Sequence, residues 1–193
     1  MYKSLIKKKF QDLNDNEILS LAIDNLEEDI KLYDEYSSHF LINYPETSKM
    51  FKQMSILKNK NRKKLVELHK KKFGETLNIT NQKEIANYFK RKPEWLVIKN
   101  SIEKVRNEII EMETLSAKFY NSFAKKSQNI EIRNLLIDLA LMSREQKDNA
   151  KLILLNAQKS RSAQEEVTKD KRQFILHGSS RGLPVLWMDQ LQL

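Results

Sequence analysis

The fold is decided first by residues 14–40, which read NDNEILSLAIDNLEEDIKLYDEYSSHF. Asn14 and Glu17 have the spacing of a capping box, in which the Asn14 side chain accepts from a first-turn amide and Glu17 reaches back. The apolar residues that follow recur every three or four positions: Leu19, Ala22, Ile23, Leu26, Ile30, Tyr33 and Phe40. This stripe predicts one long amphipathic helix whose apolar side is buried against other helices.

A second helix and a crossover are predicted after Pro45. The apolar pattern resumes at Glu46 and continues to Phe73, where Gly74 is suited to a left-handed cap. The link between the first two helices is short, so they should be antiparallel. Residues 75–99 differ: they carry a short amphipathic helix from about 82 to 91 and are long enough to join opposite ends of a bundle.

Two more helices complete the pattern. Asn100 and Glu103 predict a capping box for the third helix, and a break at residues 127–129 separates it from the fourth. Four helices with a crossover after the second predict an all-α, ferritin-like four-helix bundle over residues 14–158. Residues 1–13 form a basic N-terminal segment. Residues 159–193 are expected to be a tail, in which Gly178, Gly182 and Pro184 rule out a continuing helix.

Composition restricts the chemistry. The 193 residues include 3 Gly, 3 Pro and no Cys, so disulfides, thiolate catalysis and iron–sulfur clusters are excluded. No apolar run has the length of a membrane span and no signal peptide is recognised, which predicts a cytoplasmic protein. The net charge of +9 comes from lysines spread along the helices. This spread favours a solvated surface and does not favour nucleic acid as a partner.

The two helix pairs resemble each other. Leu26 precedes Tyr33 by seven residues, as Glu113 precedes Tyr120. The second helices match at three positions each, Met54, Lys58 and Asn61 in one and Leu139, Ser143 and Gln146 in the other. A central two-metal site between the pairs would leave such a twofold pattern.

The sequence is similar to the rubrerythrin-type, cytosolic domain of membrane-bound ferritins, in which a di-iron bundle precedes a vacuolar-iron-transporter-like membrane domain. The resemblance covers roughly residues 14–155. It is carried by residues 21–23 with 27–29 and Tyr33, then Tyr44–Pro45, residues 65–74, the crossover run 91–97, Met112–Glu113 and Phe119–Tyr120.

The resemblance implies iron in the family and a lost site in this chain. The family site takes one Glu from each of two helices and a Glu-x-x-His pair from each of the other two. Those six positions correspond here to Leu26, Lys58, Asn61, Glu113, Ser143 and Gln146. Only Glu113 keeps a ligand type, so we expect no intact metal site and no cofactor. Lys58 and Glu113 are predicted to form a buried ion pair, so that Glu113→Gln costs a few kcal/mol of stability.

Other candidate residues are given structural roles. Leu26, Leu139 and Met142 are expected in the core, and Asn61 and Gln146 are expected to hydrogen-bond each other or water. Glu27 and Glu28 should face solvent. The three histidines, His39, His69 and His177, are placed at the surface or rim, and Trp95 and Trp187 are taken as packing anchors.

No catalytic residue is predicted, because the sequence has neither a Gly-rich phosphate loop nor a nucleophile–base pair. The leading interpretation is a non-catalytic ferritin-like domain that serves as a scaffold, an interaction module or a remnant of an iron-handling membrane ferritin. One alternative is an iron-binding or peroxide-handling protein with a site around Glu113, Glu27 and Glu28. A second alternative is binding of acidic surfaces through the lysine-rich faces.

Two kinds of partner are considered. Leu32 and Tyr36, left over from the first stripe, offer a surface for a homodimer. In fused relatives the bundle leads into a membrane helix, and residues 173–176, 182–183 and 188–189 resemble that junction. The tail is therefore expected to be a remnant of the junction to a missing membrane domain, and a separate membrane partner is considered.

Overall fold

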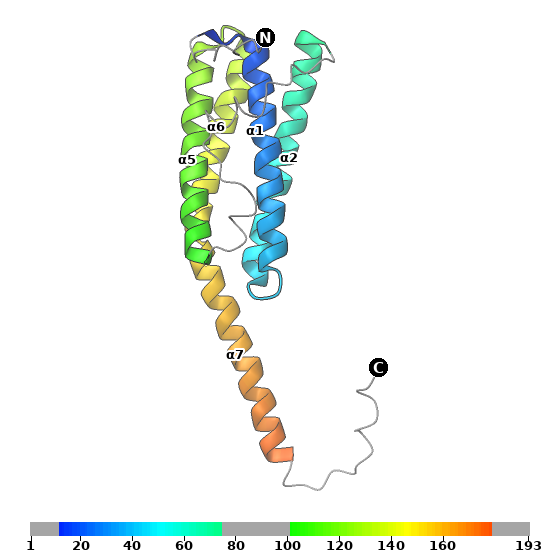
Figure 1. The fold of residues 1–193 in the computed structure, drawn as a ribbon, viewed down its shortest axis with the longest axis vertical. Helices are drawn as coiled ribbons and strands as arrows, with labels where there is room; N and C mark the ends of the chain where they lie inside the picture. The colour runs from blue at the N-terminus through cyan, green and yellow to red at the C-terminus, as the bar shows by residue number, and fades with distance from the viewer. Residues whose placement is uncertain (1–11, 75–100, 179–193) are drawn as a thin grey trace, which may run out of the picture.

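The computed structural model describes residues 12–74 and 101–178, in which long α-helices are joined by short links. These helices are α1 (Asp15–Phe40), α2 (Pro45–Phe73), α5 (Ile102–Lys126), α6 (Ile130–Ala150) and α7 (Ile153–Gly178). The hairpin α1–α2 lies beside the hairpin α5–α6 (Figure 1). The predicted all-α, ferritin-like bundle is confirmed. The short helix predicted between about 82 and 91 lies outside the described residues.

The helix ends follow local chemistry. At the start of α1 the side chain of Asn14 accepts from the backbone N–H of Glu17, and Glu17 accepts from that of Asn14, both at 2.9 Å. The predicted capping box is confirmed. Gly74 follows α2 with a φ of +86°, which glycine adopts without strain. At α5 the prediction is wrong, because the N-cap is Ser101, whose hydroxyl accepts from the N–H of Lys104 at 3.4 Å.

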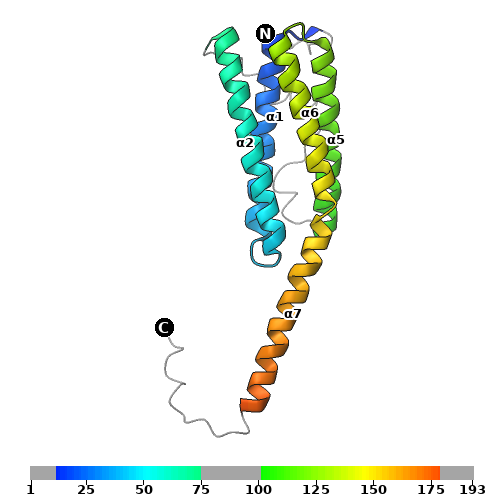
Figure 2. The same cartoon turned by 180° about the vertical axis from the view of Figure 1, so that it is seen from behind.

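The chain does not leave the helical state near residue 160. After a turn at residues 151–152, α7 continues to Gly178 and extends beyond the end of the bundle where α1 meets α2 (Figures 1 and 2). The expectation of a non-helical tail is therefore wrong up to residue 178. Residues 153–177 contain neither Gly nor Pro, so nothing local breaks the helix earlier.

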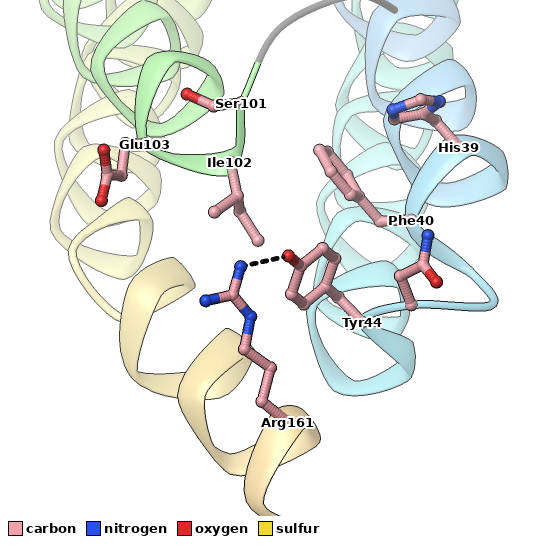
Figure 3. A pocket seen from close by; sticks show the side chains of 8 residues that line it. His39, Phe40, Tyr44, Ser101, Ile102, Glu103 and Arg161 are labelled. Atoms are coloured by element: carbon pink, nitrogen blue, oxygen red, sulfur yellow. Dashed lines mark hydrogen bonds between the residues drawn. The ribbon is translucent and has the colours of Figure 1, made fainter. Parts of the chain in front are cut away.

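Arg161 joins α7 to the link between α1 and α2. Its guanidinium donates to the hydroxyl of Tyr44 at 2.7 Å, and its central carbon lies 5.5 Å from the centre of that ring. The contact borders a cavity of about 420 Å³ (Figure 3), lined by His39, Phe40, Asn43, Tyr44, Ser101, Ile102, Glu103 and Arg161. The ionisable residues His39, Glu103 and Arg161 are exposed, so we read this region as a joint between helices.

Two apolar clusters fill the bundle. One contains Leu26, Phe123 and Leu139, and the other contains Tyr33, Phe51 and Ile109. Tyr36 is buried in the second cluster and Leu32 packs against it. The interpretation of Leu32 and Tyr36 as spare residues for a dimer is therefore wrong, since both serve the core of their own chain. Within the described residues, no helix combines the length and apolar character that crossing a membrane requires.

Candidate functional site

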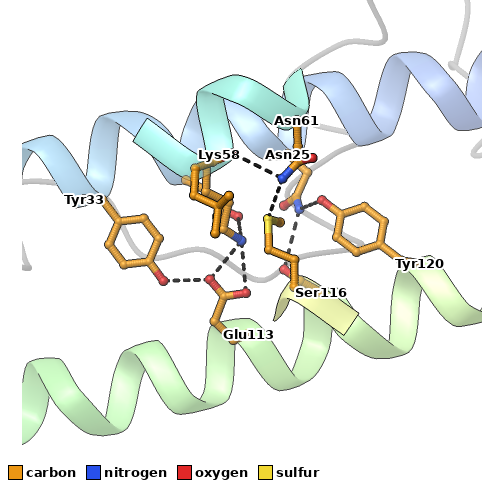
Figure 4. Close-up of polar contacts among 10 residues, drawn as sticks. Asn25, Tyr33, Lys58, Asn61, Glu113, Ser116 and Tyr120 are labelled. Carbon is orange, nitrogen blue, oxygen red and sulfur yellow. Dashed lines mark hydrogen bonds and ion pairs between the residues drawn. The ribbon is translucent and has the colours of Figure 1, made fainter. Parts of the chain in front are cut away.

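The centre of the bundle holds a buried lysine between two carboxylates. Lys58 of α2 places Nζ 2.7 Å from Oδ2 of Asp29 on α1 and 2.8 Å from Oε1 of Glu113 on α5 (Figure 4). All three side chains are 0% exposed. A buried charge without a partner costs several kcal/mol, roughly, so the three groups depend on one another. We call these three residues the ion cluster.

Tyrosine, asparagine and serine side chains surround the ion cluster and connect α1 with α5. The Tyr33 hydroxyl donates to Oε1 of Glu113 at 2.6 Å. The side-chain amide of Asn25 donates to the hydroxyl of Tyr120 at 2.7 Å and lies 3.5 Å from that of Ser116 (Figure 4). A carboxylate that accepts from both an ammonium and a phenol is well stabilised as an anion.

The charges decide which groups hold protons. Burial by itself would lower the pKa of Lys58, but the negative charges of Asp29 and Glu113 outweigh it and the pKa of Lys58 is raised. Burial also raises the pKa of Tyr120, and the nearby Lys58 ammonium offsets only part of that effect. Lys58 therefore remains an ammonium and Tyr120 a phenol at neutral pH.

These shifts predict a loss of stability in alkaline solution. Above about pH 10 the unfolded chain releases protons from Lys58 and Tyr120 that the folded chain retains. The free energy of unfolding should then fall by about 1.4 kcal/mol per pH unit for each group. Urea unfolding between about pH 9 and 11.5 measures this slope. Tyr120→Phe removes one of the two titrating groups, so the fall of the free energy of unfolding with pH should be less steep in this variant. An unchanged slope would contradict the assignment to Tyr120.

The predicted pair of Lys58 and Glu113 is confirmed, but Asp29 was missed. The expected stripe on α1 included Ile30, whereas the structure buries Asp29 and leaves Ile30 half-buried. Asp29 lies three residues after Leu26 and four before Tyr33, which is the spacing of one helix face. A carboxylate inside an apolar stripe was the signal that could have identified it.

Two predicted amides do not meet. Asn61 donates to the backbone oxygen of Leu57 at 3.2 Å and to the sulfur of Met142 at 2.9 Å. Gln146 and Ser143 are buried, and their side chains have no hydrogen-bond partner among the described residues. Of the two predicted alternatives, the hydrogen bond between Asn61 and Gln146 is therefore wrong, and hydrogen bonding to water stays a prediction. Leu26, Leu139 and Met142 are in the core, as predicted.

The remaining candidates lie apart from the ion cluster. Glu27 accepts from Arg62 at 2.8 Å and Glu28 pairs with Lys31, both at the surface as predicted. His39 is exposed as predicted.

The placement of His69 at the surface or rim is wrong. Its side chain is buried, and its Nε2 lies 2.7 Å from Oδ1 of Asn16, because the end of α2 packs beside the start of α1. Trp95 and Trp187 lie outside the described residues, and so does the side chain of His177.

Comparison with known proteins agrees with this architecture. The Rubrerythrin family model matches residues 17–152, which run from the first turn of α1 to the turn after α6 and contain the whole ion cluster. Among curated proteins and solved structures the chain has no match. Because the family match covers most of the sequence and the helices have the expected arrangement, this chain belongs to the rubrerythrin family.

Proposed function

We propose that this chain is a non-catalytic member of the rubrerythrin family, in which the ion cluster occupies the position of a di-iron site and the bundle acts as a scaffold or interaction module. The observation that carries the proposal is the contact of Lys58 Nζ with both Asp29 and Glu113. The ammonium supplies a positive charge where the family places iron, and it contacts Oδ2 of Asp29 and both carboxylate oxygens of Glu113.

The side chains at the family's ligand positions do not fit a pair of iron ions. Leu26 has no donor atom, and Lys58 is a cation that repels metal ions. Asn61, Ser143 and Gln146 offer only neutral amide or hydroxyl groups. Within residues 12–74 and 101–178, no three His, Cys, Asp or Glu side chains gather where they could share a metal ion.

The two halves of the bundle differ in a way that supports a lost site. Tyr33 donates to Glu113, which is the arrangement expected of a tyrosine beside a ligand position. In the other half the matching position is Leu26, and Tyr120 is hydrogen-bonded by Asn25 instead. The tyrosines thus keep their symmetry, while a carboxylate at the family's ligand position is present on one side only, at Glu113.

Metal analysis tests the proposal. Protein purified from iron-supplemented cells should contain far less than one iron or manganese ion per chain, because both carboxylates of the ion cluster already pair with the Lys58 ammonium. A rubrerythrin with all its di-iron ligands, purified in parallel, is the positive control. Two tightly bound transition-metal ions per chain, retained through dialysis against a chelator, would overturn the proposal.

The alternatives receive unequal support. An unconventional iron site formed by Glu113, Glu27 and Glu28 finds none, since Glu113 is buried while Glu27 and Glu28 pair with surface cations. Binding of acidic surfaces is favoured by the outer side of α2, where Lys60, Lys63 and Lys64 are exposed and form no ion pair with any described residue. Binding to anionic vesicles that weakens steeply with added salt would support this second candidate.

A further inference from the structure

A groove opens where α7 leaves the bundle. It has a volume of about 750 Å³ and lies between the first turn of α2, at Pro45 and Glu46, and the part of α7 that carries Ala163 and Val167. From there α7 runs on beyond the end of the bundle (Figure 2). The groove is therefore formed by two helices on one side and is open on the other.

The groove prolongs the side of α7 that packs on the bundle. Ala157 and Ser160 are buried on that side. Val167 follows Ser160 by seven residues and so lies on the same side of the helix, but it is 55% exposed. The link that leads into α2 also exposes Leu41 by 61% and Ile42 by 83%. Large apolar side chains grouped in this way are typical of a surface that another segment covers.

We propose that residues 183–188 of the same chain, which read LPVLWM, turn back and occupy this groove, with Trp187 beside Val167. These residues are the longest uncharged apolar run after α7. An indole ring has a large apolar surface and one N–H donor, which suits a groove lined by both apolar and polar groups.

The length of the chain allows this contact. Val167 lies 11 residues before Gly178, which is about 16 Å along a helix. An extended chain covers that distance in about five residues. Residues 179–182 read SSRG, a composition typical of turns, and Trp187 is five residues after Gly182. A chain that reverses at 179–182 therefore brings Trp187 level with Val167.

The tether and the charge of the groove both favour this occupant over a separate molecule. A short tether keeps the segment at an effective concentration of about 1 mM, so a contact with a dissociation constant of about 1 mM would already be half occupied. The charged residues that line the groove, Glu46 and Lys159, have opposite signs. The groove thus offers no net charge to attract an acidic or a basic partner, and the segment 183–188 carries none.

Fluorescence of Trp187 provides the first test. The chain has two Trp, so Trp95→Phe leaves Trp187 as the only one. In this variant the emission of Trp187 should lie at shorter wavelength, and be quenched less by acrylamide, than in the same chain unfolded in urea. Adding Val167→Glu places a carboxylate in the groove, so the emission should shift to longer wavelength and quenching should increase.

Leu155→Glu is the matched control for this substitution. Leu155 is also on α7 and is 47% exposed, but it lies on a different side of the helix. The control should leave the emission of Trp187 unchanged. Circular dichroism should show the same helix content for both glutamate variants, since each replaces an exposed side chain.

Engineered cysteines test the position of the segment and keep Val167 and Trp187 in place. The chain has no Cys, so a pair of substitutions supplies its only two thiols. Ala163→Cys with Met188→Cys should form a disulfide within one chain in dilute, oxidising solution. Glu165→Cys with Met188→Cys is the matched control, because Glu165 is at nearly the same height on the opposite side of α7 and should form far less of it.

Several results would overturn the proposal. The emission of Trp187 in the folded chain could equal that of the unfolded chain, which would leave the groove open. An emission that Val167→Glu does not change would place Trp187 elsewhere. Disulfides between chains instead of within one chain would assign the groove to a second copy. Equal cross-linking from Ala163→Cys and Glu165→Cys would show that the segment does not dock.

Discussion

Replacing Lys58 with methionine is expected to lower the free energy of unfolding by about 3–5 kcal/mol. Methionine has a similar length, so the variant keeps the volume but leaves Asp29 and Glu113 buried without a counter-charge. That cost is a large fraction of the stability of a typical domain. Urea unfolding followed by circular dichroism measures it. Acidification should restore part of the stability, because protonation removes the two buried negative charges.

Lys52→Met is the matched control for this prediction. Lys52 also lies on α2 and pairs with an aspartate, Asp34, at 2.8 Å, but both side chains are exposed. Exposed pairs contribute about 0–1 kcal/mol, so this change should be nearly neutral. The triple change Lys58→Met, Asp29→Asn and Glu113→Gln removes every charge and should recover much of the loss. If Lys58→Met unfolds at the same urea concentration as wild type, the ion cluster does not hold the bundle together.

Removing both carboxylates should cost far more than the sum of removing each. Because Lys58 contacts two anions, Glu113→Gln alone leaves it paired with Asp29, and Asp29→Asn alone leaves it paired with Glu113. Each single change is expected to cost about 1 kcal/mol, and the double change about 4 kcal/mol or more. The cost expected from the sequence for Glu113→Gln was larger, because Asp29 was not counted as a partner.

The double variant also has a pH signature. Without its carboxylates, burial would lower the pKa of Lys58 below that of an exposed lysine. Its stability should then rise as the pH increases from about 7 to 10, since the unfolded chain binds a proton that the folded chain excludes. The stability of wild type should instead fall as the pH rises in alkaline solution, because the pKa of its Lys58 is raised. A double-mutant cycle with additive costs would show that the two carboxylates do not substitute for each other as partners of Lys58, and it would contradict this prediction.

The ion cluster divides the core in two. Its members come from α1, α2 and α5, and they lie between the apolar cluster that includes Leu26 and the one that includes Tyr33. A charged layer tolerates less sliding than an apolar one, because a shift of one helical turn would separate ammonium from carboxylate. We infer that the cluster fixes the register of α1 and α2 against α5 in addition to any effect on stability.

The ends of the first two helices could be predicted because residues close in the sequence determine them. The capping box of Asn14 and Glu17, the restart at Pro45 and the glycine after Phe73 involve neighbouring residues only, so their outcome does not depend on the rest of the fold. The pair of Lys58 and Glu113 was also accessible, through the resemblance to a family whose ligand positions these two residues occupy. The Asn100 cap was placed one residue too early, since Ser101 can fill the same role.

The sequence by itself determined four amphipathic helices and their order, and it is the source of our proposal that the family's metal ligands are lost. Only the tertiary structure decided that Asp29 completes the ion cluster, that Gln146 does not meet Asn61, and that α7 continues to Gly178 beyond the bundle. The reason is physical. Periodicity fixes which side of a helix is buried, but the rotation of each helix by a fraction of a turn decides which side chain reaches a partner on another helix.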